Sequence, residues 1–300
     1  MSYFDYDLAI LGGGPAGLTA GLYAARARLK TIMFEKVVLG GQILVTDWIE
    51  NYPGFPEGIS GYDLAQKMAD QVARFNVPIK NEQVLGIEFA GRVKRLRLKD
   101  KTISVCAVII ATGASPNRLN IPGEETLLGK GVSYCATCDG PFYKGKRVAV
   151  AGGGNSAIQE AIFLTKFADK VFVIHRRQEL RATKILQERA FANPKIKFIL
   201  DSSVISIEGK NVVEKLMVEN KTHRGISELL VDGLFVFVGI KANSGFLPAD
   251  IKRDDRGFVL TDQSMETSVP GVYAAGDIRN TPLRQVVTAA GDAAIAAYSA

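Results

Sequence analysis

Short apolar runs alternate along the chain with segments in which small and apolar residues recur at helical spacing. The run 7–11 leads into a small-residue helical segment that ends near residue 28, and a second apolar run follows at 31–34. The same order returns at 147–150, in a helical segment that ends near residue 168, and at 171–174. This internal repeat of a strand–helix–strand unit predicts an α/β fold with parallel sheets covered by helices.

The remaining segments predict how the two units are connected. We expect a helix over residues 60–75, strands up to residue 113, a more polar strand-rich region over 196–230 and a buried strand over 234–240. A strand near 269–275 then enters a Gly–Asp turn, and an Ala-rich helix follows from residue 284. Breaks at 113–116 and 241–244 predict that one domain is inserted into the other. The first domain then comprises residues 1–114 and 245–300, and the inserted domain comprises 115–244.

A glycine-rich loop joins strand to helix in the first unit. Its characteristic residues are Gly12, Gly14, Pro15, Ala16 and Gly17. Glycines at these positions allow a tight turn, a close approach of the backbone to a pyrophosphate and close packing of helix on strand. Glu35, which follows the second strand, stands where an acid hydrogen-bonds a ribose hydroxyl. The loop alone is weak support, but with strand, helix and acid in order it predicts dinucleotide binding.

The second unit repeats the loop but ends its second strand differently. The loop contains Gly152, Gly154, Asn155 and Ser156. In place of the acid, the strand is followed by His175, Arg176 and Arg177, with Arg181 shortly after. Guanidinium groups carry a fixed charge and match phosphate oxygens, so this cluster suits the 2′-phosphate of NADPH; the alternative is a solvated basic turn. The first unit, with its acid, suits an adenine dinucleotide that has a free ribose.

The segment 40–55 is rich in Gly, Pro and amide side chains. Turn chemistry explains the Gly and Pro residues. It explains Gln42 and Asn51 less well, and these two amides are suited to hydrogen-bond a flavin or its ribityl chain.

Composition narrows the class of protein. The chain is 47% hydrophobic with 30 Gly in 300 residues, as expected for a globular protein. No run approaches the ~18 apolar residues of a membrane span, and the acidic N-terminus is unlike a signal peptide, so we expect a cytoplasmic protein. The net charge of +6, without a basic arm, is compatible with an acidic protein partner and argues against nucleic-acid binding.

Two of the three cysteines, Cys135 and Cys138, are separated by two residues. That spacing permits a strained, reducible disulfide on one side of a helical turn. Half of a zinc site and a pair of buried thiols are the alternatives. Zinc would need four ligands, and the sequence has no second CxxC and no histidine pair at suitable spacing, so we expect no metal. Cys106, within an apolar run, is expected to lie in the core.

Taken in order, these motifs resemble those of the low-molecular-weight thioredoxin reductases. The matching pieces are the first glycine loop with Glu35, residues 50–54, 111–113, the segment CATCD at 135–139, the second glycine loop, the basic cluster at 175–181, residues 275–277, and 284–285. The resemblance covers nearly the whole chain, and CATCD between a linker and the second glycine loop is its most specific part. Residues 36–60 contain no cysteine, unlike the larger glutathione-reductase-like enzymes.

The resemblance implies two Rossmann-like, three-layer ββα domains, with the NADPH domain inserted into a discontinuous FAD domain. Besides the first loop and Glu35, it implies FAD contacts from Gly41, Gln42, Asn51, Thr112, Gly113, Asp277, Arg284 and Gln285. It implies that electrons pass from NADPH to FAD, then to a Cys135–Cys138 disulfide, and finally to thioredoxin or a thioredoxin-like protein. It also implies a homodimer.

Two details of this mechanism follow from the resemblance. Asp139 would protonate the departing thiolate; a helix N-cap or a turn is the alternative role for this residue. The nicotinamide and the cysteine pair belong to the same inserted domain yet must reach one flavin. We therefore expect the inserted domain to rotate about linkers near 113–116 and 239–244.

Other functions are compatible with parts of the sequence. Some relatives of this fold are FAD-dependent dithiol oxidases, which tend to lack the basic NADPH cluster. A reductase of another small redox protein is a second alternative. A flavin-binding module with a silent CxxC would leave the second glycine loop without a purpose.

Overall fold

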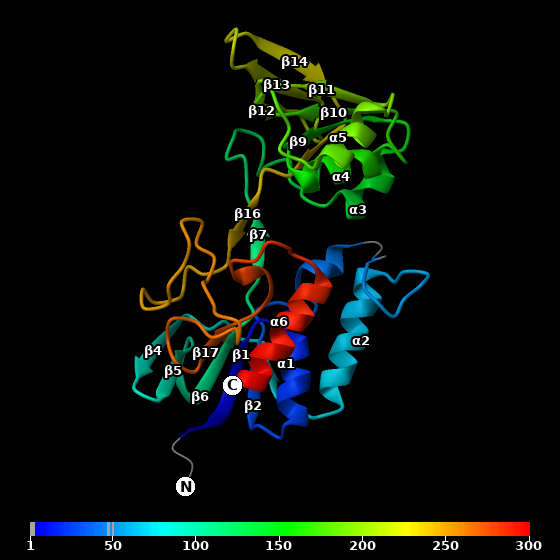
Figure 1. Ribbon diagram of the computed structural model, residues 1–300. Coiled ribbons are helices and arrows are strands. Elements are labelled where there is room, and N and C mark those ends of the chain that lie inside the picture. Colours follow the sequence, from blue (N-terminus) through cyan, green and yellow to red (C-terminus); the bar gives the residue numbers. More distant parts are fainter. Residues whose placement is uncertain (1–3, 47–48, 50) are drawn as a thin grey trace. The chain divides into compact units, whose positions relative to one another are not determined.

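The computed structural model describes residues 4–46, 49 and 51–300, and the side chains of Val45, Thr137 and Cys138 lie outside this description. The chain divides into two compact units, residues 1–115 with 241–300, and residues 116–240 (Figure 1). The expected boundaries were after residues 114 and 244. The second lies earlier because Ala242 and Ser244 are buried with the first unit, where Ala242 joins its hydrophobic core.

The first unit is built on a sheet with strand order β3-β2-β1-β6-β5-β4, and β17 also pairs with β6. The parallel strands are β1 (Tyr6–Leu11), β2 (Thr31–Phe34), β3 (Ile79–Lys80), β6 (Thr102–Ile110) and β17 (Val272–Ala274). The antiparallel strands β4 (Gly86–Ala90) and β5 (Val93–Arg97) extend it beside β6. Because β1 and β2 are buried on both faces, they read as unbroken apolar runs.

Two hydrophobic clusters divide the faces of this sheet. On one face the alternate strand residues Leu8, Ile10 and Ile109 pack with α1 (Pro15–Arg26), α2 (Gly61–Ala73) and α6 (Val286–Ser299). These three helices lie side by side in Figure 1. On the other face Ala9 and Val108 pack with residues from the segment 242–278. The unit therefore has a helical layer, a central sheet and a second layer of strands and loops.

The second unit repeats this plan. Its parallel sheet has the order β11-β10-β9-β15-β8. The strands are β8 (Val132–Ser133), β9 (Arg147–Ala151), β10 (Lys170–Ile174), β11 (Ile196–Ile199) and β15 (Gly233–Val236). One face packs with α3 (Ala136–Asp139), α4 (Asn155–Leu164) and α5 (Lys184–Phe191). The other face packs against an antiparallel sheet of β12 (Ser202–Glu208), β13 (Lys215–Asn220) and β14 (Ile226–Leu230).

The strand–helix–strand repeat and the α/β class are confirmed, as are the helices expected near 60–75 and from 284. Two expectations were wrong. The strand expected over 234–240 ends at Val236, and Ile240–Ala242 form a separate strand, β16, which pairs with β7 (Ala114–Pro116). Gly239, with φ +118°, lies at the break between β15 and β16.

Cys106 is exposed and does not lie in the core. It belongs to the first part of β6, which pairs with the antiparallel strand β5 and alternates between buried and exposed residues. The apolar run therefore does not predict burial at this position.

Candidate dinucleotide sites and redox centre

Several of the residues predicted to contact a dinucleotide in the first unit lie at or shortly after the carboxyl ends of its parallel strands. Gly12 follows β1, Glu35 follows β2, Thr112 and Gly113 come after β6, and Asp277 comes after β17. In open α/β sheets this edge is where ligands bind. The topology thus brings together residues that are far apart in the sequence.

The glycines of the first loop differ in what a side chain would meet. A Cβ on Gly17 would lie 1.8 Å from the Gly12 carbonyl oxygen, and one on Gly12, where φ is +113°, would lie 2.3 Å from the Ala111 oxygen. At Gly14, the N-cap of α1, the nearest described atoms would be 3.9 Å away. Gly12 and Gly17 are therefore required for packing, whereas Gly14 leaves space for a ligand at the helix N-terminus.

Glu35 fixes this loop from the end of β2. Its Oε2 accepts a hydrogen bond from the Gly13 amide at 2.7 Å, and its Oε1 accepts one from the Val37 amide at 3.0 Å. The next loop also contacts the glycine loop, since a Cβ on Gly41 would lie 3.1 Å from the Gly14 Cα. The acid therefore supports the loop as well as standing where a ribose hydroxyl binds.

Asn51 and Gln285, which are both predicted to contact FAD, are hydrogen-bonded to each other although 234 positions separate them in the sequence. Asn51 Nδ2 donates to Gln285 Oε1 at 2.8 Å. Gln285 is also the N-cap of α6 and forms a reciprocal capping box with Thr288. Gln42 is exposed, and its Nε2 donates to the Ala114 carbonyl at 3.3 Å. The amides of the 40–55 segment therefore lie on the same unit as the start of α6.

Two partly buried charged residues, Asp277 and Arg284, lie at the Gly276–Asp277 turn. Burial raises the pKa of Asp277, whereas the positive charge of Arg284 lowers it. The Arg284 guanidinium lies 4.2 Å from the ring centre of Phe258, and its Nε is buried without a hydrogen-bond partner in the described part of the chain. An uncompensated donor of this kind is costly unless a ligand satisfies it.

Asp292 and Arg279, which sequence reasoning did not select as site residues, support the same turn. Arg279 Nη1 donates to Asp292 Oδ1 at 2.6 Å, and Asp292 Oδ2 accepts from the Gly276 amide at 3.2 Å. Nothing in the local sequence pairs these two residues, which lie in different elements. Only the packing of α6 against the turn brings them together.

The glycine loop of the second unit packs against His175. A Cβ on Gly153 would lie 2.4 Å from His175 Nδ1, and one on Gly152 would lie 2.3 Å from the Phe237 oxygen. A Cβ on Gly154, the N-cap of α4, would have no described atom within 4 Å. His175 itself is buried, and among the described residues its Nε2 has no hydrogen-bond partner. As in the first loop, two glycines of this loop are packed against neighbouring atoms, whereas the glycine at the helix N-cap, Gly154, has open space beside it.

The three predicted arginines gather beside His175 and are exposed. Burial lowers the pKa of His175, and the positive charges of Arg181, Arg177 and Arg176 lower it further. The Arg181 amide donates to the Gly153 carbonyl at 2.7 Å, which closes the basic segment onto the loop. Asn155 Oδ1 accepts from the Thr183 amide at 2.8 Å, and Ser156 is exposed nearby at the start of α4.

The CxxC segment lies at the short helix α3 (Ala136–Asp139) of the second unit, with Cys135 directly before the helix. Cys135 is disulfide-bonded, and its expected partner, Cys138, has a side chain outside the described residues. Ser133 holds Cys135 in place: its hydroxyl accepts from the Cys135 amide at 3.0 Å and donates to the Cys135 carbonyl at 3.1 Å. Sequence reasoning missed this serine, although a hydroxyl two residues before the motif is the available signal.

Asp139 ends α3 and is partly exposed. Although it precedes the short helix η2 (Gly140–Tyr143), its side chain makes no capping hydrogen bond with any described residue. Burial raises the pKa of Tyr143 to about 12, and the negative charges of Asp139 and Asp232 add to this rise. The capping role considered for this aspartate is therefore not seen.

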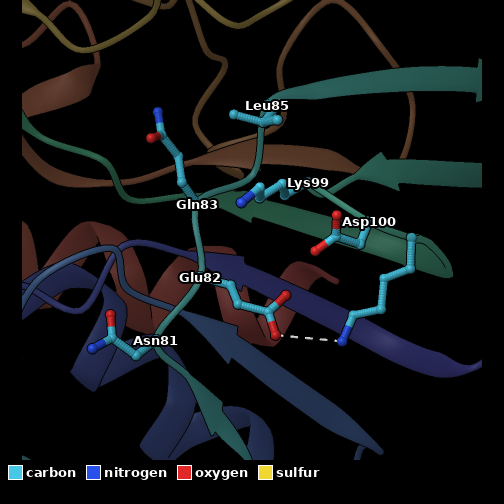
Figure 2. A pocket seen from close by; sticks show the side chains of 7 residues that line it. Asn81, Glu82, Gln83, Leu85, Lys99 and Asp100 are labelled. Carbon is cyan, nitrogen blue, oxygen red and sulfur yellow. Dashed lines mark hydrogen bonds and ion pairs between the residues drawn. The ribbon is translucent and has the colours of Figure 1, made fainter.

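A separate hollow in the first unit contains none of the predicted site residues. Figure 2 shows the side chains that line it, from Asn81, Glu82, Gln83, Leu85, Lys99, Asp100 and Lys101. Lys101 Nζ lies 3.3 Å from Glu82 Oε1. The lining of this hollow mixes acids with lysines, so it gives no preference for a phosphate.

Across the described residues, no group of three or more His, Cys, Asp and Glu side chains is arranged to hold a metal ion. Within the same residues, no helix has the length and apolar character needed to cross a membrane.

The fold and the sites define a two-unit protein in which each unit carries a dinucleotide-type glycine loop and one unit carries a disulfide. Residues 6–293 match the family model of the pyridine nucleotide-disulphide oxidoreductases. The chain is 44% identical to the thioredoxin reductase of Peptoclostridium acidaminophilum, over 98% of this chain and 96% of that protein.

Solved structures agree with the sequence matches. The thioredoxin reductase of Lactococcus lactis matches with a TM-score of 0.88 and 42% identity, covering 98% of this chain and 97% of that one. That of T. acidophilum matches with a TM-score of 0.85 and 34% identity, covering 98% and 97%. The chain belongs to the thioredoxin reductases of the pyridine nucleotide-disulphide oxidoreductase family.

Proposed function

We propose that this chain is an NADPH-dependent, FAD-containing reductase of thioredoxin or a thioredoxin-like protein. The observation that carries the proposal is the disulfide-bonded Cys135 in the same unit as the second glycine loop and its basic cluster. The relatives named above are thioredoxin reductases over nearly their whole length. A flavin-binding module or a dithiol oxidase would not need the arginines beside His175.

The first unit fits FAD. Gly14 leaves open space at the N-terminus of α1, where the helix dipole favours a pyrophosphate. The buried Arg284 Nε is a donor that awaits an acceptor. We propose that the first loop, Glu35, Gly41, Gln42, Asn51, Thr112, Gly113, Asp277, Arg284 and Gln285 hold this cofactor.

The second unit fits NADPH. Gly154 leaves open space at the N-terminus of α4, and the three arginines supply fixed positive charge at the end of β10. The buried His175 Nε2, without a partner in the described region, is a further polar group available to a ligand. We propose that the NADPH site comprises Gly152, Gly154, Asn155, Ser156, His175, Arg176, Arg177 and Arg181.

When bound, the two cofactors supply hydride transfer between nicotinamide and flavin and a two-electron reduction of the disulfide. The protein holds Cys135 through Ser133, and Asp139, at the end of α3, supplies the proton that a departing thiolate takes up. The cysteine pair is the proposed Cys135–Cys138 disulfide, which exchanges with the disulfide of the partner.

We also propose that the inserted unit rotates about its two linkers during turnover. The connections contain Gly113 with φ +64° and Gly239 with φ +118°, backbone conformations that glycine adopts at little cost. The homodimer and the cytoplasmic location expected for this family belong to the same proposal.

The first experiment separates the alternatives. NADPH is expected to bleach the bound flavin under anaerobic conditions, and oxidised thioredoxin is then expected to restore its colour. A flavin that NADPH leaves oxidised would favour an oxidase or a binding module. A flavin that is bleached but is not re-oxidised by thioredoxin would indicate another disulfide partner.

A second experiment tests the basic cluster. Replacing Arg176 and Arg181 together with alanine removes two charged donors, each worth about 1.5–3 kcal/mol, so kcat/KM for NADPH is expected to fall at least ~100-fold. The value for NADH should change little. Lys210→Ala removes an exposed charge from the same unit and is the matched control. Equal efficiency of the wild type with NADH and NADPH would contradict the assignment.

A further inference from the structure

Glu124 is a buried acid of the second unit that no part of the proposed function uses. The residue is only 4% exposed. Its Oε1 accepts from the Leu119 amide at 2.8 Å, and its Oε2 accepts from the Asn120 amide at 2.6 Å. The same Oε1 also accepts from Tyr134 Oη at 2.6 Å. One carboxylate therefore joins the chain that leaves the first connection to the residue directly before Cys135.

The first of these two segments enters the second unit from β7. Asn120 has a φ of +56°, a backbone conformation that few residues other than glycine and asparagine adopt. The carboxylate stabilises this turn, because it binds the Asn120 amide and the amide before it. Earlier in the same segment, the Asn117 amide donates to the Gly239 carbonyl at 2.9 Å. The segment is thus fixed to the second connection as well as to Glu124.

The second segment carries Cys135 from one face of the parallel sheet to the other. Tyr134 packs on the hydrophobic cluster between the two sheets of the unit, whereas Ala136 is buried in the cluster on the helical face. Ser133, buried at the end of β8, binds both the amide and the carbonyl of Cys135. With Tyr134 held by Glu124, the residues on both sides of Cys135 are anchored.

The contact between Tyr134 and Glu124 is a charge-assisted hydrogen bond. Burial raises the pKa of Tyr134, and the hydrogen bond to Glu124 and the charge of that residue raise it further, against the positive charge of Arg118. The tyrosine hydroxyl therefore keeps its proton and donates at neutral pH. Such bonds to a carboxylate are roughly twice as strong as those between neutral groups.

We propose that Glu124 and Tyr134 are positioning residues for the redox pair, whose hydrogen bond holds the Cys135 backbone where its sulfur pairs with Cys138. The inference rests on the proposed function, which assigns Cys138 as the disulfide partner. A fixed backbone lowers the entropic cost of bringing two thiols together, so it favours the disulfide over the dithiol. Both residues act through the backbone of Cys135.

The test measures the equilibrium between disulfide and dithiol. The full chain is equilibrated at neutral pH in mixtures of reduced and oxidised dithiothreitol and then alkylated, and mass spectrometry counts the thiols in the peptide that contains residues 135–138. Dithiothreitol supplies two electrons and two protons, which break the sulfur–sulfur bond, and it closes its own disulfide.

Tyr134→Phe removes only the hydroxyl and is expected to leave the protein folded. The equilibrium constant for disulfide formation should fall roughly five- to tenfold, and a tenfold fall corresponds to about 30 mV for this two-electron couple. A purely structural role would change the free energy of unfolding and leave this equilibrium of the folded protein unchanged. A wild-type constant for Tyr134→Phe would overturn the inference.

Glu124→Gln changes the other partner of the same hydrogen bond. The variant removes the charge that strengthens the contact, so its constant should shift in the same direction. Because both substitutions act on one contact, the double variant should shift no more than about twofold beyond the larger single shift. Shifts that add in full would show two independent effects and would contradict the proposed link.

Tyr143→Phe is the matched control, because Tyr143 is a second buried tyrosine beside the redox helix. Its hydroxyl lies at β15, where a methyl group on Gly233 would be 2.8 Å away. This variant should keep the wild-type constant, and a shift as large as that of Tyr134→Phe would also overturn the inference. Since dithiothreitol replaces NADPH and no thioredoxin is added, failure of the proposed function would leave the result readable.

Discussion

We expect the ion pair between Arg279 and Asp292 to stabilise the Gly276–Asp277 turn, and this contribution can be measured. The two side chains are only 14% and 13% exposed. Asp292 also accepts from the Gly276 amide, while Arg279 Nε donates to Thr261 Oγ1 at 3.0 Å. Replacing Asp292 with asparagine removes the negative charge and leaves a buried guanidinium with a weaker partner.

The expected loss follows from burial. Removing one member of a fully buried ion pair costs about 3–5 kcal/mol. Asparagine keeps one acceptor oxygen, and the pair retains some solvent contact, so we expect about 2–3 kcal/mol here. Since each 1.4 kcal/mol is a factor of ten, local opening of the turn should become roughly 30- to 150-fold more frequent.

Hydrogen exchange measures this opening. Peptides that cover β17, the turn and α6 should exchange faster in Asp292→Asn, while peptides from the second unit serve as an internal reference. Glu82→Gln is the matched control, because the Lys101–Glu82 pair is 52% and 38% exposed and such pairs contribute less than about 1 kcal/mol. The reasoning is refuted if Asp292→Asn exchanges like Glu82→Gln, or if both units accelerate equally.

Two further predictions concern single contacts. Gly17→Ala places a methyl group 1.8 Å from the Gly12 oxygen and should abolish soluble protein. The methyl group of Gly14→Ala has open space, so this variant should keep the fold but lower the flavin-to-protein absorbance ratio. A folded Gly17→Ala protein would contradict this reasoning. Glu124 is buried and accepts hydrogen bonds from Tyr134 Oη at 2.6 Å and from two backbone amides. Glu124→Gln should therefore lower the free energy of unfolding of the second unit by about 1–3 kcal/mol, as measured by urea denaturation. This loss should exceed that of Tyr134→Phe. The opposite order would show that the amide contacts contribute little.

The sequence predicted the parts of the fold that depend on local pattern. The two strand–helix–strand units follow from apolar periodicity and from glycines whose Cβ atoms would collide with backbone, such as Gly12 and Gly17. The hydrogen bond between Asn51 and Gln285 was not predicted, because the local context of neither residue pairs it with the other.

Features that depend on tertiary packing were not predictable in this way. Asn243 lies in a stretch that the sequence presents as a simple break. In the structure its Nδ2 donates to the Thr112 carbonyl at 2.8 Å, and its Oδ1 accepts from Ser115 at 2.8 Å. These bonds hold the second connection against the first, so the boundary between the units falls before residue 241. Cys106 was misassigned for a related reason, since an apolar run does not reveal that a neighbouring strand leaves one face open.

The residue after the second strand has a similar structural role in both units, although its chemistry differs. In the first unit Glu35 accepts a hydrogen bond from the Gly13 amide, and in the second the His175 ring packs on Gly153. Each therefore fixes the middle glycine of its loop, by a charge-assisted hydrogen bond in one case and by contact in the other. Exchanging the two residues would change the expected ribose preference and also remove the support of each loop. Cofactor preference and loop geometry are thus coupled at this position.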